Sequence, residues 1–251
     1  MFLKQRLRTG APLHAVVNII PSAVATQAIA AGGADLVMID REHGPIGRES
    51  LHAMVAATAG TQCAAVVRVP AIDETEVKLA LDAGAEGIVF PLVRGARDAE
   101  RCVSLVTYPP EGQRGWGPFL AHSRFGTTLA DYAGAVGPEV TCCLLIETVE
   151  AVEEIDAVVA VPGVDAVVVA QFDLTTALGV HGQFDSPRFR DAMSAVERAA
   201  RAHGVPLGAA ALTPEQSAEL VARGHRLLFH GFDVLMLRDQ VAAFRTWTAD
   251  G

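Results

Sequence analysis

Charged side chains follow several of the short apolar segments in this sequence, at the points where each segment ends. Asp40 and His43 follow one segment, and Arg68 ends the next. Glu147 and Asp173 follow two later segments. Two carboxylates without a cysteine or histidine ligand pattern suit a hard divalent cation, Mg2+ or Mn2+ first, with Co2+ or Zn2+ also able to bind. Each carboxylate has a structural alternative, because Glu147 could cap the helix that follows and Asp173 could be the N-cap of a short helix.

His43 has the chemistry of a general base, because an unperturbed imidazole titrates near neutral pH. Asp40 lies three residues earlier and could orient the ring, while the structural alternative for His43 is a solvated loop histidine. Arg68 ends an apolar segment and needs an anionic or carbonyl partner, since burying an unpaired guanidinium is costly. That partner is either a substrate carboxylate or enolate oxygen, or an internal ion pair with Asp40, Glu42 or Glu147.

The apolar pattern predicts the elements that bring these distant segments together. Continuous runs of Val, Ile and Leu are typical of parallel strands that are covered on both faces. The predicted strands are 14–18, 35–40, 64–69, 87–90, 141–146, 165–170, 206–210 and 227–230. The predicted helices are 21–32, 47–59, 74–83, 96–106, 149–160, 188–203, 214–223 and 234–248.

Eight successive strand-then-helix units predict an α/β protein with a single (β/α)8 TIM barrel over residues 1–251, and a doubly wound open sheet is the rival arrangement. Asp73, Ser186 and Thr213 stand where helix N-caps belong, and glycines such as Gly84 and Gly204 follow predicted helices. In a barrel the C-terminal ends of all strands share one mouth, so the candidate side chains are expected to meet there.

One long excursion interrupts the pattern before the fifth strand. Residues 107–140 are rich in Gly, Pro and aromatic residues. A loop of this length in a compact domain is usually functional.

Composition and motifs exclude several classes of function. The formal net charge of −9 argues against nucleic-acid binding, which needs a basic surface. The four cysteines form no CxxC pair and are expected to be buried thiols in a reducing compartment. No apolar run approaches the roughly 20 residues that span a bilayer, and the N-terminus lacks a signal-peptide core. We therefore expect a soluble, cytoplasmic protein with no membrane partner; dinucleotide, P-loop and GxSxG motifs are also missing.

Six short motifs in register resemble the HpcH/HpaI family of class II pyruvate aldolases. They cover about residues 10–240. The motifs are Val-Met-Ile-Asp-Arg-Glu-His-Gly-Pro (37–45), Val-Arg-Val-Pro (67–70), Leu-Asp-Ala-Gly-Ala (81–85) with Gly-Ile-Val-Phe-Pro (87–91), Tyr-Pro-Pro-Glu-Gly-Gln-Arg-Gly (108–115), Ile-Glu-Thr (146–148) and Phe-Asp-Leu-Thr-Thr-Ala-Leu-Gly (172–179). The type member of this family cleaves 4-hydroxy-2-oxoheptanedioate, and relatives cleave 2-keto-3-deoxy sugar acids.

The resemblance implies a carbon–carbon lyase of the aldehyde-lyase type, which joins or cleaves pyruvate and an aldehyde through a pyruvate enolate. It assigns the divalent metal to Glu147 and Asp173. It makes Arg68 the group that binds the 2-oxo oxygen of the substrate. It makes His43, paired with Asp40, the group that moves the proton of the 4-hydroxyl group.

The resemblance also implies that backbone amides from Gln171 through Phe172 to Asp173 grip the pyruvate carboxylate. It further implies that the C-terminal helix is exchanged between subunits of a homohexamer. A lysine Schiff base is the other route to an enolate, but Lys4 and Lys78 are the only lysines and neither ends a predicted strand.

Departures from the family pattern leave the reaction partner open, and the excursion at Ala121-His122-Ser123-Arg124 aligns ambiguously with the family's arginine for the distal carboxylate. Leu145 stands where the family often has Gln, and Ala170-Gln171 stands where it usually has Gly-Pro. The alternative functions are therefore an oxaloacetate decarboxylase or another pyruvate-enolate enzyme with an unusual acceptor. A barrel that binds a small acid or a protein partner without turnover is a further alternative.

Overall fold

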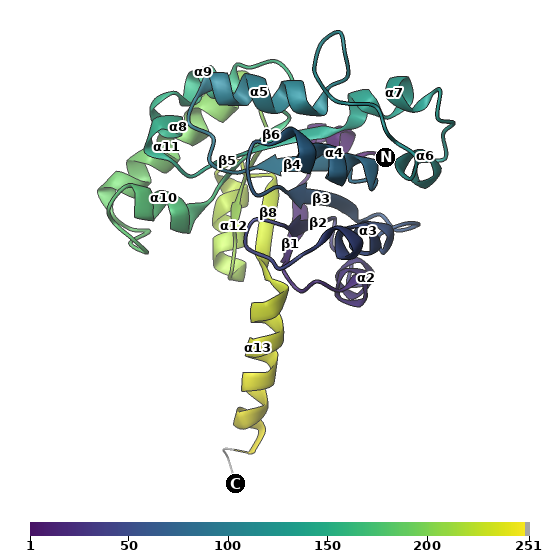
Figure 1. The fold of residues 1–251 in the computed structure, drawn as a ribbon. Coiled ribbons are helices and arrows are strands. Elements are labelled where there is room, and N and C mark those ends of the chain that lie inside the picture. The colour runs from purple at the N-terminus through teal and green to yellow at the C-terminus, as the bar shows by residue number, and fades with distance from the viewer. Residues whose placement is uncertain (249–251) are drawn as a thin grey trace.

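The computed structural model describes residues 1–248 and contains a closed barrel of eight parallel strands that are paired in chain order (Figure 1). The strands are β1 (Leu13–Asn18), β2 (Leu36–Asp40), β3 (Ala64–Arg68), β4 (Gly87–Phe90), β5 (Thr141–Ile146), β6 (Ala166–Val169), β7 (Leu207–Ala210) and β8 (Leu227–Phe232). The prediction of a (β/α)8 barrel is confirmed, and the rival open sheet is wrong. Residues 249–251 of the predicted single domain lie outside the described residues.

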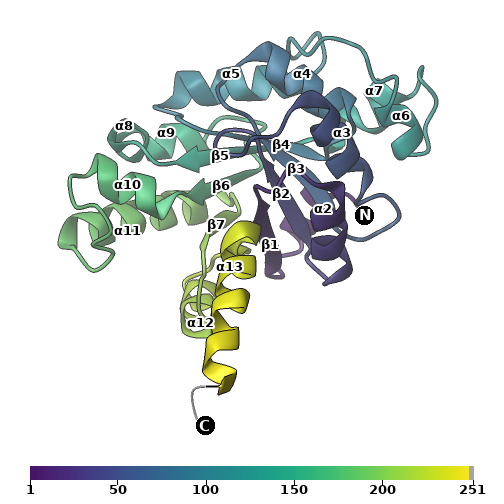
Figure 2. The ribbon, with the colours of Figure 1, turned by 60° about the horizontal axis from the view of Figure 1, so that its bottom comes forward.

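Most of the helices lie between successive strands and cover the outside of the barrel, whereas α1 precedes β1 and α13 and η2 follow β8 (Figure 2). They are α1 (Leu3–Arg8), α2 (Ala23–Ala31), α3 (Arg48–Ala56), α4 (Glu74–Asp82), α5 (Ala96–Val106), α6 (Ala121–Arg124), α7 (Tyr132–Ala135), η1 (Gly137–Glu139), α8 (Val149–Glu153), α9 (Ile155–Val159), α10 (Gln171–Ala177), α11 (Pro187–His203), α12 (Pro214–Ala222), α13 (Asp233–Ala243) and η2 (Phe244–Thr248).

Helix boundaries follow the capping residues that the sequence provides. Asp73, Ser186 and Thr213 are N-caps, and each side chain accepts a hydrogen bond from a backbone N–H of the first turn. Gly204 ends α11 in the left-handed conformation with φ of 68°, which glycine adopts without steric cost. The predicted helix 149–160 is two helices, because Glu154 leaves helical geometry with φ of −97° and ψ of 13°.

Apolar side chains pack in two layers on the two faces of the barrel wall. One layer fills the interior and includes Val17, Met38 and Leu145. The other layer lies between the strands and the surrounding helices, with Leu81 and Leu144 among its members. Because alternate residues of each strand feed both layers, both faces of the sheet are buried, as the continuous apolar runs predict.

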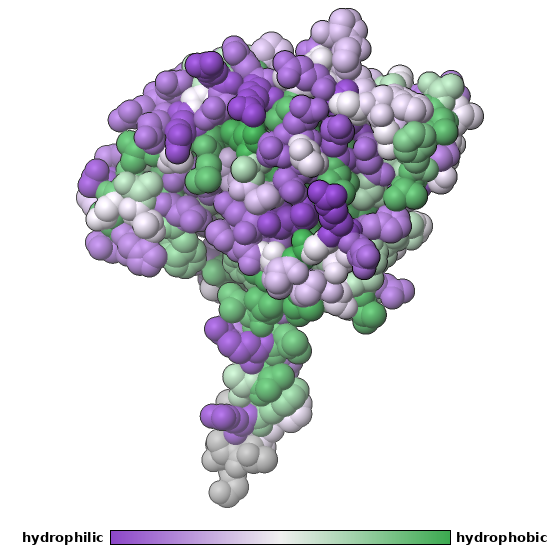
Figure 3. All heavy atoms as spheres, viewed as in Figure 1, coloured by the Kyte–Doolittle hydropathy of each residue, from purple (hydrophilic) through white to green (hydrophobic). Residues whose placement is uncertain are grey.

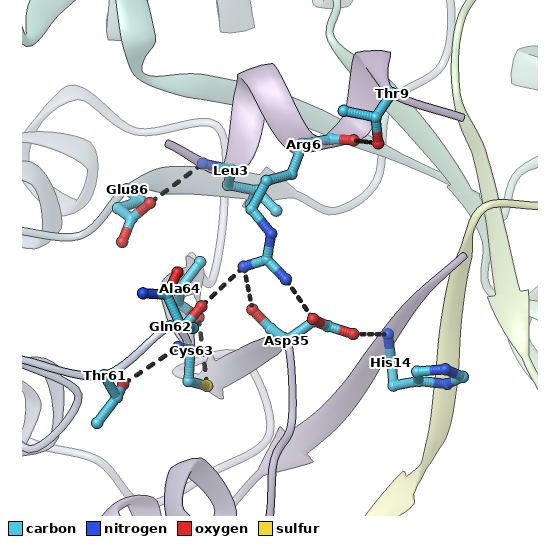
Figure 4. Close-up of polar contacts among 10 residues, drawn as sticks. All are labelled: Leu3, Arg6, Thr9, His14, Asp35, Thr61, Gln62, Cys63, Ala64 and Glu86. Atoms are coloured by element: carbon cyan, nitrogen blue, oxygen red, sulfur yellow. Dashed lines mark hydrogen bonds and ion pairs between the residues drawn. The ribbon is translucent and has the colours of Figure 1, made fainter. Parts of the chain in front are cut away.

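The N-terminal helix α1, which the sequence pattern did not predict, closes the end of the barrel where the strands begin. Leu3 and Leu7 are buried in the interior layer. Arg6 fixes the helix from another side: its guanidinium donates to the backbone oxygens of Asp35 and Gln62 and pairs with the Asp35 carboxylate (Figure 4). The six-residue helix is too short to stand alone, so these contacts hold it in place.

The long excursion packs against the side of the barrel near α1, through α6, α7 and η1 (Figure 1). Arg114 is buried, with its guanidinium carbon 4.4 Å from the centre of the Tyr108 ring. Arg124 donates to the backbone oxygen of Val55 and to the hydroxyl of Thr58. These anchors order a segment that lacks long helices of its own.

The last helix, α13, leaves the barrel instead of packing back over it (Figure 1). Only Asp233 at its start is buried. Apolar side chains gather on the projecting segment (Figure 3); the exposed members are Val234, Leu235, Met236, Leu237, Val241, Phe244 and Trp247. The outer face of β1 and β8 consequently exposes His14 and half-exposes His230, whose rings stack.

The state of the cysteines and the lengths of the helices can be read directly from the described residues. All four cysteines are buried free thiols, as the sequence predicts. Within residues 1–248, no helix combines the length and apolar character needed to cross a membrane.

Candidate active site

Strand register places Asp40 and Arg68 side by side at the mouth of the barrel. They are the last residues of β2 and β3 and face each other as register partners. The Asp40 carboxylate accepts two hydrogen bonds from Arg68, at 2.9 Å from Nε and 2.5 Å from Nη2. Asp40 is fully buried and Arg68 is 7% exposed, so this bidentate pair lies in a region of low dielectric.

Glu42 is a second carboxylate beside the Arg68 guanidinium. Its Oε2 atom lies 3.0 Å from Nη1 of Arg68. Burial alone would lower the pKa of Arg68, but the hydrogen bonds and charge of Asp40, together with the charge of Glu42, outweigh it and raise the pKa. Arg68 therefore stays protonated. Two of its five N–H groups donate to Asp40, and Nη1 lies at ion-pair distance from Glu42, so at least two N–H groups remain for a ligand.

His43 lies on the rim, and its side chain is 64% exposed. The Asp40 carboxylate accepts a hydrogen bond from the backbone N–H of His43 at 3.2 Å, so it holds the backbone of this turn. The carboxylate oxygen near the ring belongs to Glu42, at 3.9 Å from Nε2. The structure thus pairs Asp40 with Arg68, as in the internal ion-pair alternative, and brings Glu42 rather than Asp40 toward the imidazole.

Glu147 follows β5 and is buried at the same mouth. The N-cap of the following helix is Thr148, so Glu147 does not have the capping role that was its structural alternative. Its Oε1 atom accepts a hydrogen bond of 2.5 Å from the backbone N–H of Leu92. Leu92 has a φ of 57°, which is rare for a residue other than glycine. This turn after β4 therefore orients one oxygen of Glu147 at the cost of local backbone strain.

Asp173 lies in the first turn of α10, directly after β6, together with Gln171 and Phe172. The N-cap position belongs to Ala170, so Asp173 is not the cap of this helix. The Gln171 side chain accepts a hydrogen bond from the backbone N–H of Ala210 and links the ends of β6 and β7. Phe172 is exposed and packs edge-on against Phe184.

Three carboxylates at this mouth repel one another. Burial raises the pKa of Glu147, and the charges of Glu42 and Asp173 raise it further. Burial likewise raises the pKa of Glu42, with contributions from the charges of Asp40 and Asp173. Arg68 offsets only part of this negative charge.

This arrangement fits a divalent cation that has few protein ligands. Oε2 of Glu42 is buried and makes no hydrogen bond of normal geometry. Within the described residues, no group of three His, Cys, Asp or Glu side chains is spaced to hold a metal ion by itself. Mg2+ commonly uses one or two carboxylates and completes its octahedron with water and substrate oxygens. Glu147 and Asp173 suit such an open site.

Sequence reasoning missed two contributors to this site. Glu42 was considered only as a possible ion-pair partner, although its place between Asp40 and His43 in the same turn was a usable signal. Leu92 gave no signal, because its role comes from a backbone N–H group in a left-handed conformation that the residue type does not indicate.

Three comparisons with known proteins show what this chain resembles in sequence and in fold. The family model described as HpcH/HpaI aldolase/citrate lyase matches residues 20–239. The 2-dehydro-3,6-dideoxy-6-sulfogluconate aldolase of Pseudomonas putida is 33% identical over 86% of this chain and 84% of its own. The hydroxypyruvate/pyruvate aldolase of Roseovarius nubinhibens is 32% identical over 88% of each chain. Among solved structures, the citrate synthase SbnG has a TM-score of 0.89 and 28% identity, covering 99% of this chain and 98% of its own.

The fold, the site and these relatives define a (β/α)8-barrel lyase that acts on carbon–carbon bonds. The chain belongs to the HpcH/HpaI aldolase/citrate lyase family.

Replacing Asp40 by Ala should destabilise the protein strongly, because it removes the bidentate partner of a buried guanidinium. We expect a loss of about 3–5 kcal/mol in the free energy of unfolding, toward the lower end since Glu42 remains. Denaturant unfolding followed by circular dichroism at a fixed protein concentration measures it. Asp191→Ala, an exposed change on α11, is the control and should stay within about 0.5 kcal/mol. Equal stability of the two variants would contradict a structural role for the Asp40–Arg68 pair.

Proposed function

We propose that this protein is a divalent-metal-dependent aldolase that makes or breaks 4-hydroxy-2-oxo acids through a pyruvate enolate. The supporting observation is the group of carboxylates around Arg68, in which Glu147 carries a raised pKa from burial and from its acidic neighbours. A bound Mg2+ or Mn2+ would relieve this repulsion and act as a Lewis acid toward the 2-oxo group. Glu147 and Asp173 are the proposed ligands.

Arg68 is proposed to hold the oxygen that gains negative charge when the carbon–carbon bond parts. Two of its N–H groups remain after the contacts to Asp40 and Glu42. Because carboxylates fix the guanidinium in advance, little reorganisation is needed as charge develops on the substrate oxygen. Arg68 would therefore stabilise the enolate more than the ground-state ketone.

The first turn of α10 is proposed to bind the pyruvate carboxylate. Leu174 makes the first intrahelical hydrogen bond, to Ala170, so the backbone N–H groups of Gln171, Phe172 and Asp173 remain for other acceptors. Helix N-termini favour anions. The pyruvate carboxylate would then lie beside Asp173 and within reach of the same cation.

His43 is proposed to move the proton of the 4-hydroxyl group. Its exposed position on the rim suits a group that meets the aldehyde part of the substrate and solvent. Glu42 Oε2 lies 3.9 Å from Nε2 of the ring and is the carboxylate oxygen in ion-pair distance of it. The Schiff-base route lacks a lysine, because Lys4 pairs with Asp165 at the opposite end of the barrel and Lys78 lies on α4.

Replacing Glu147 by Gln should weaken Mn2+ binding at least about tenfold, because a ligand matters at least as much as the outer-shell groups whose loss costs 10–100-fold. Electron paramagnetic resonance of free Mn2+ measures the binding. The same variant should lose metal-stimulated exchange of the pyruvate methyl protons in D2O. Glu150→Gln, an exposed change three residues away on α8, is the matched control. Full exchange by chelated Glu147→Gln protein would reject the proposed metal chemistry.

The second candidate function is an enolate reaction with a different partner, such as oxaloacetate decarboxylation. It is favoured by the similarity in fold to a citrate synthase and by two side chains near the site: Leu145, which is apolar and buried beneath it, and Gln171, whose amide binds the backbone of Ala210. One preparation should be assayed with oxaloacetate and with pyruvate plus a panel of aldehydes, each with Mg2+, Mn2+ or Co2+. Faster aldol turnover than oxaloacetate decarboxylation is expected; the reverse would favour the second candidate.

We also propose that the chain forms a homohexamer in which α13 is exchanged between subunits. The support is the exposed apolar surface of α13 and the uncovered outer face of β1 and β8. An apolar surface of this kind usually marks a protein interface. The exchanged helix of one subunit would cover this face of another.

Replacing Leu237 by Asp should reduce the assembly, because it places a charge in the proposed interface at a side chain that is 60% exposed in one chain. Light scattering after size-exclusion chromatography measures the mass. The parent protein should have about six times the 26.3 kDa chain mass. Ala53→Asp, on the exposed side of α3, should leave the mass unchanged. A monomeric parent protein would contradict the assembly.

A further inference from the structure

A cavity of about 580 Å³ opens at the end of the barrel opposite Glu147, where the strands begin. Its walls come from α1, from the C-terminal ends of α11 and α12, and from the turns that lead into β6, β7 and β8. We propose that this cavity binds a small anion that carries at least two negative charges, of the phosphate or polycarboxylate type. The proposal is independent of the reaction at the barrel mouth.

Positive charge is concentrated around this cavity. Five basic side chains line it: Lys4, Arg8, Arg201, Arg223 and Arg226. The acidic side chains in the lining are Asp165 and Glu197. The formal charge of the lining is therefore +3, with His203 counted as neutral, although the whole chain carries −9. A positive lining on an acidic protein attracts anions to this one place.

Only part of this positive charge is neutralised internally. Lys4 pairs with Asp165 at 3.1 Å, and Arg223 pairs with Glu197 at 2.8 Å. Arg8, Arg201 and Arg226 have no carboxylate within ion-pair distance in residues 1–248. An anion would therefore meet three guanidinium groups that still lack a charged partner.

Two of these arginines donate hydrogen bonds to backbone oxygens, but each keeps other N–H groups that can donate to a ligand. Arg201 Nη2 donates to the backbone oxygen of Arg223 at 3.1 Å. Arg226 Nη1 donates to the backbone oxygens of His225 and Val221 at 2.8 and 3.3 Å. Both arginines thus bind carbonyl groups at or near the end of α12, which is a common role for cations there. The other N–H groups of each guanidinium remain for a ligand.

Arg8 makes none of these capping contacts, yet its position is fixed by its helix. Lys4 and Arg8 are four residues apart and share one face of α1. Arg6 lies on another face and holds α1 against Asp35 and Gln62 (Figure 4). The helix therefore presents Arg8 to the cavity without a large loss of backbone freedom on binding.

The pKa of the buried His225 is affected by the same positive charges. It is fully buried, and Nε2 lies 3.0 Å from Glu197. Burial lowers its pKa, and the charges of Arg223 and Arg226 lower it further in spite of Glu197. An anion in the cavity would reduce the mutual repulsion of these cations, so binding should stabilise the fold.

The chemistry of the lining defines the ligand class. A guanidinium presents paired N–H groups that match two oxygens of one carboxylate or phosphate. Three such groups around one cavity favour a ligand with several oxygens and at least two charges over chloride or acetate. Pyrophosphate and citrate represent the two sources of this chemistry and are small enough for the cavity.

Isothermal titration calorimetry of the full chain, as purified and without added metal, tests the proposal with pyrophosphate and citrate as separate ligands. Chloride at matched ionic strength gives the non-specific baseline. We expect saturable binding with a Kd on the order of 0.1–1 mM at low salt for at least one ligand, weakened by added salt. Binding of pyrophosphate would identify a phosphate ligand, and binding of citrate would identify a polycarboxylate ligand.

Arg8→Gln and Arg226→Gln should each weaken this binding about fivefold, the effect of losing one partly exposed ion pair. Arg97→Gln, an exposed change on α5 that also removes one positive charge, should leave the Kd unchanged. Arg8→Gln removes no capping hydrogen bond, so it tests the site even if Arg226→Gln fails to fold. The proposal is overturned if neither ligand binds saturably, or if Arg97→Gln weakens binding as much as Arg8→Gln. Because the proposed metal ligands are untouched, loss of anion binding is distinguishable from failure of the aldolase reaction.

Discussion

The buried ion pair between Asp40 and Arg68 is the constraint on which the mouth of this barrel depends. Adjacent strands end together at these two residues, so the pair forms wherever the register of β2 and β3 is kept. A guanidinium with no partner could not remain there at acceptable cost. Because Asp40 accepts two hydrogen bonds from Arg68 and two from the turn that carries Glu42 and His43, one carboxylate positions three groups of the proposed site.

Excess negative charge is the second property of the mouth, and it explains why a cation suits it. Glu42, Glu147 and Asp173 come from three different strand ends; burial raises the pKa of Glu147 and of Glu42, and the charges of Glu42 and Asp173 raise that of Glu147 further. A protein that needed only a stable fold would gain from replacing such groups with apolar ones. Their presence beside a strained Leu92 is typical of a site where stability is exchanged for function.

The two ends of the barrel differ in charge as well as in role. The mouth gathers acidic groups around one arginine, whereas the closed end gathers arginines around a cavity. In both places polar groups lie where strands meet turns, because the interior of the barrel is filled by apolar side chains such as Val17 and Leu145. The projecting α13 adds a third surface that a single chain leaves without a partner.

The sequence by itself determined the eight strands and the longer helices between them, and it predicted the mouth of the barrel as the place of the site. Apolar runs, N-caps such as Asp73 and Thr213, and the strand-end positions of Glu147 and Asp173 are local signals, and the barrel topology follows from their order. Only the tertiary structure decided which side chains pair: Asp40 with Arg68 rather than with the His43 ring, Glu42 toward that ring, and the Leu92 N–H onto Glu147. It also decided that α1 closes the barrel and that α13 leaves it. These outcomes depend on distances between segments far apart in the chain and on backbone geometry, which residue types and spacing do not encode locally.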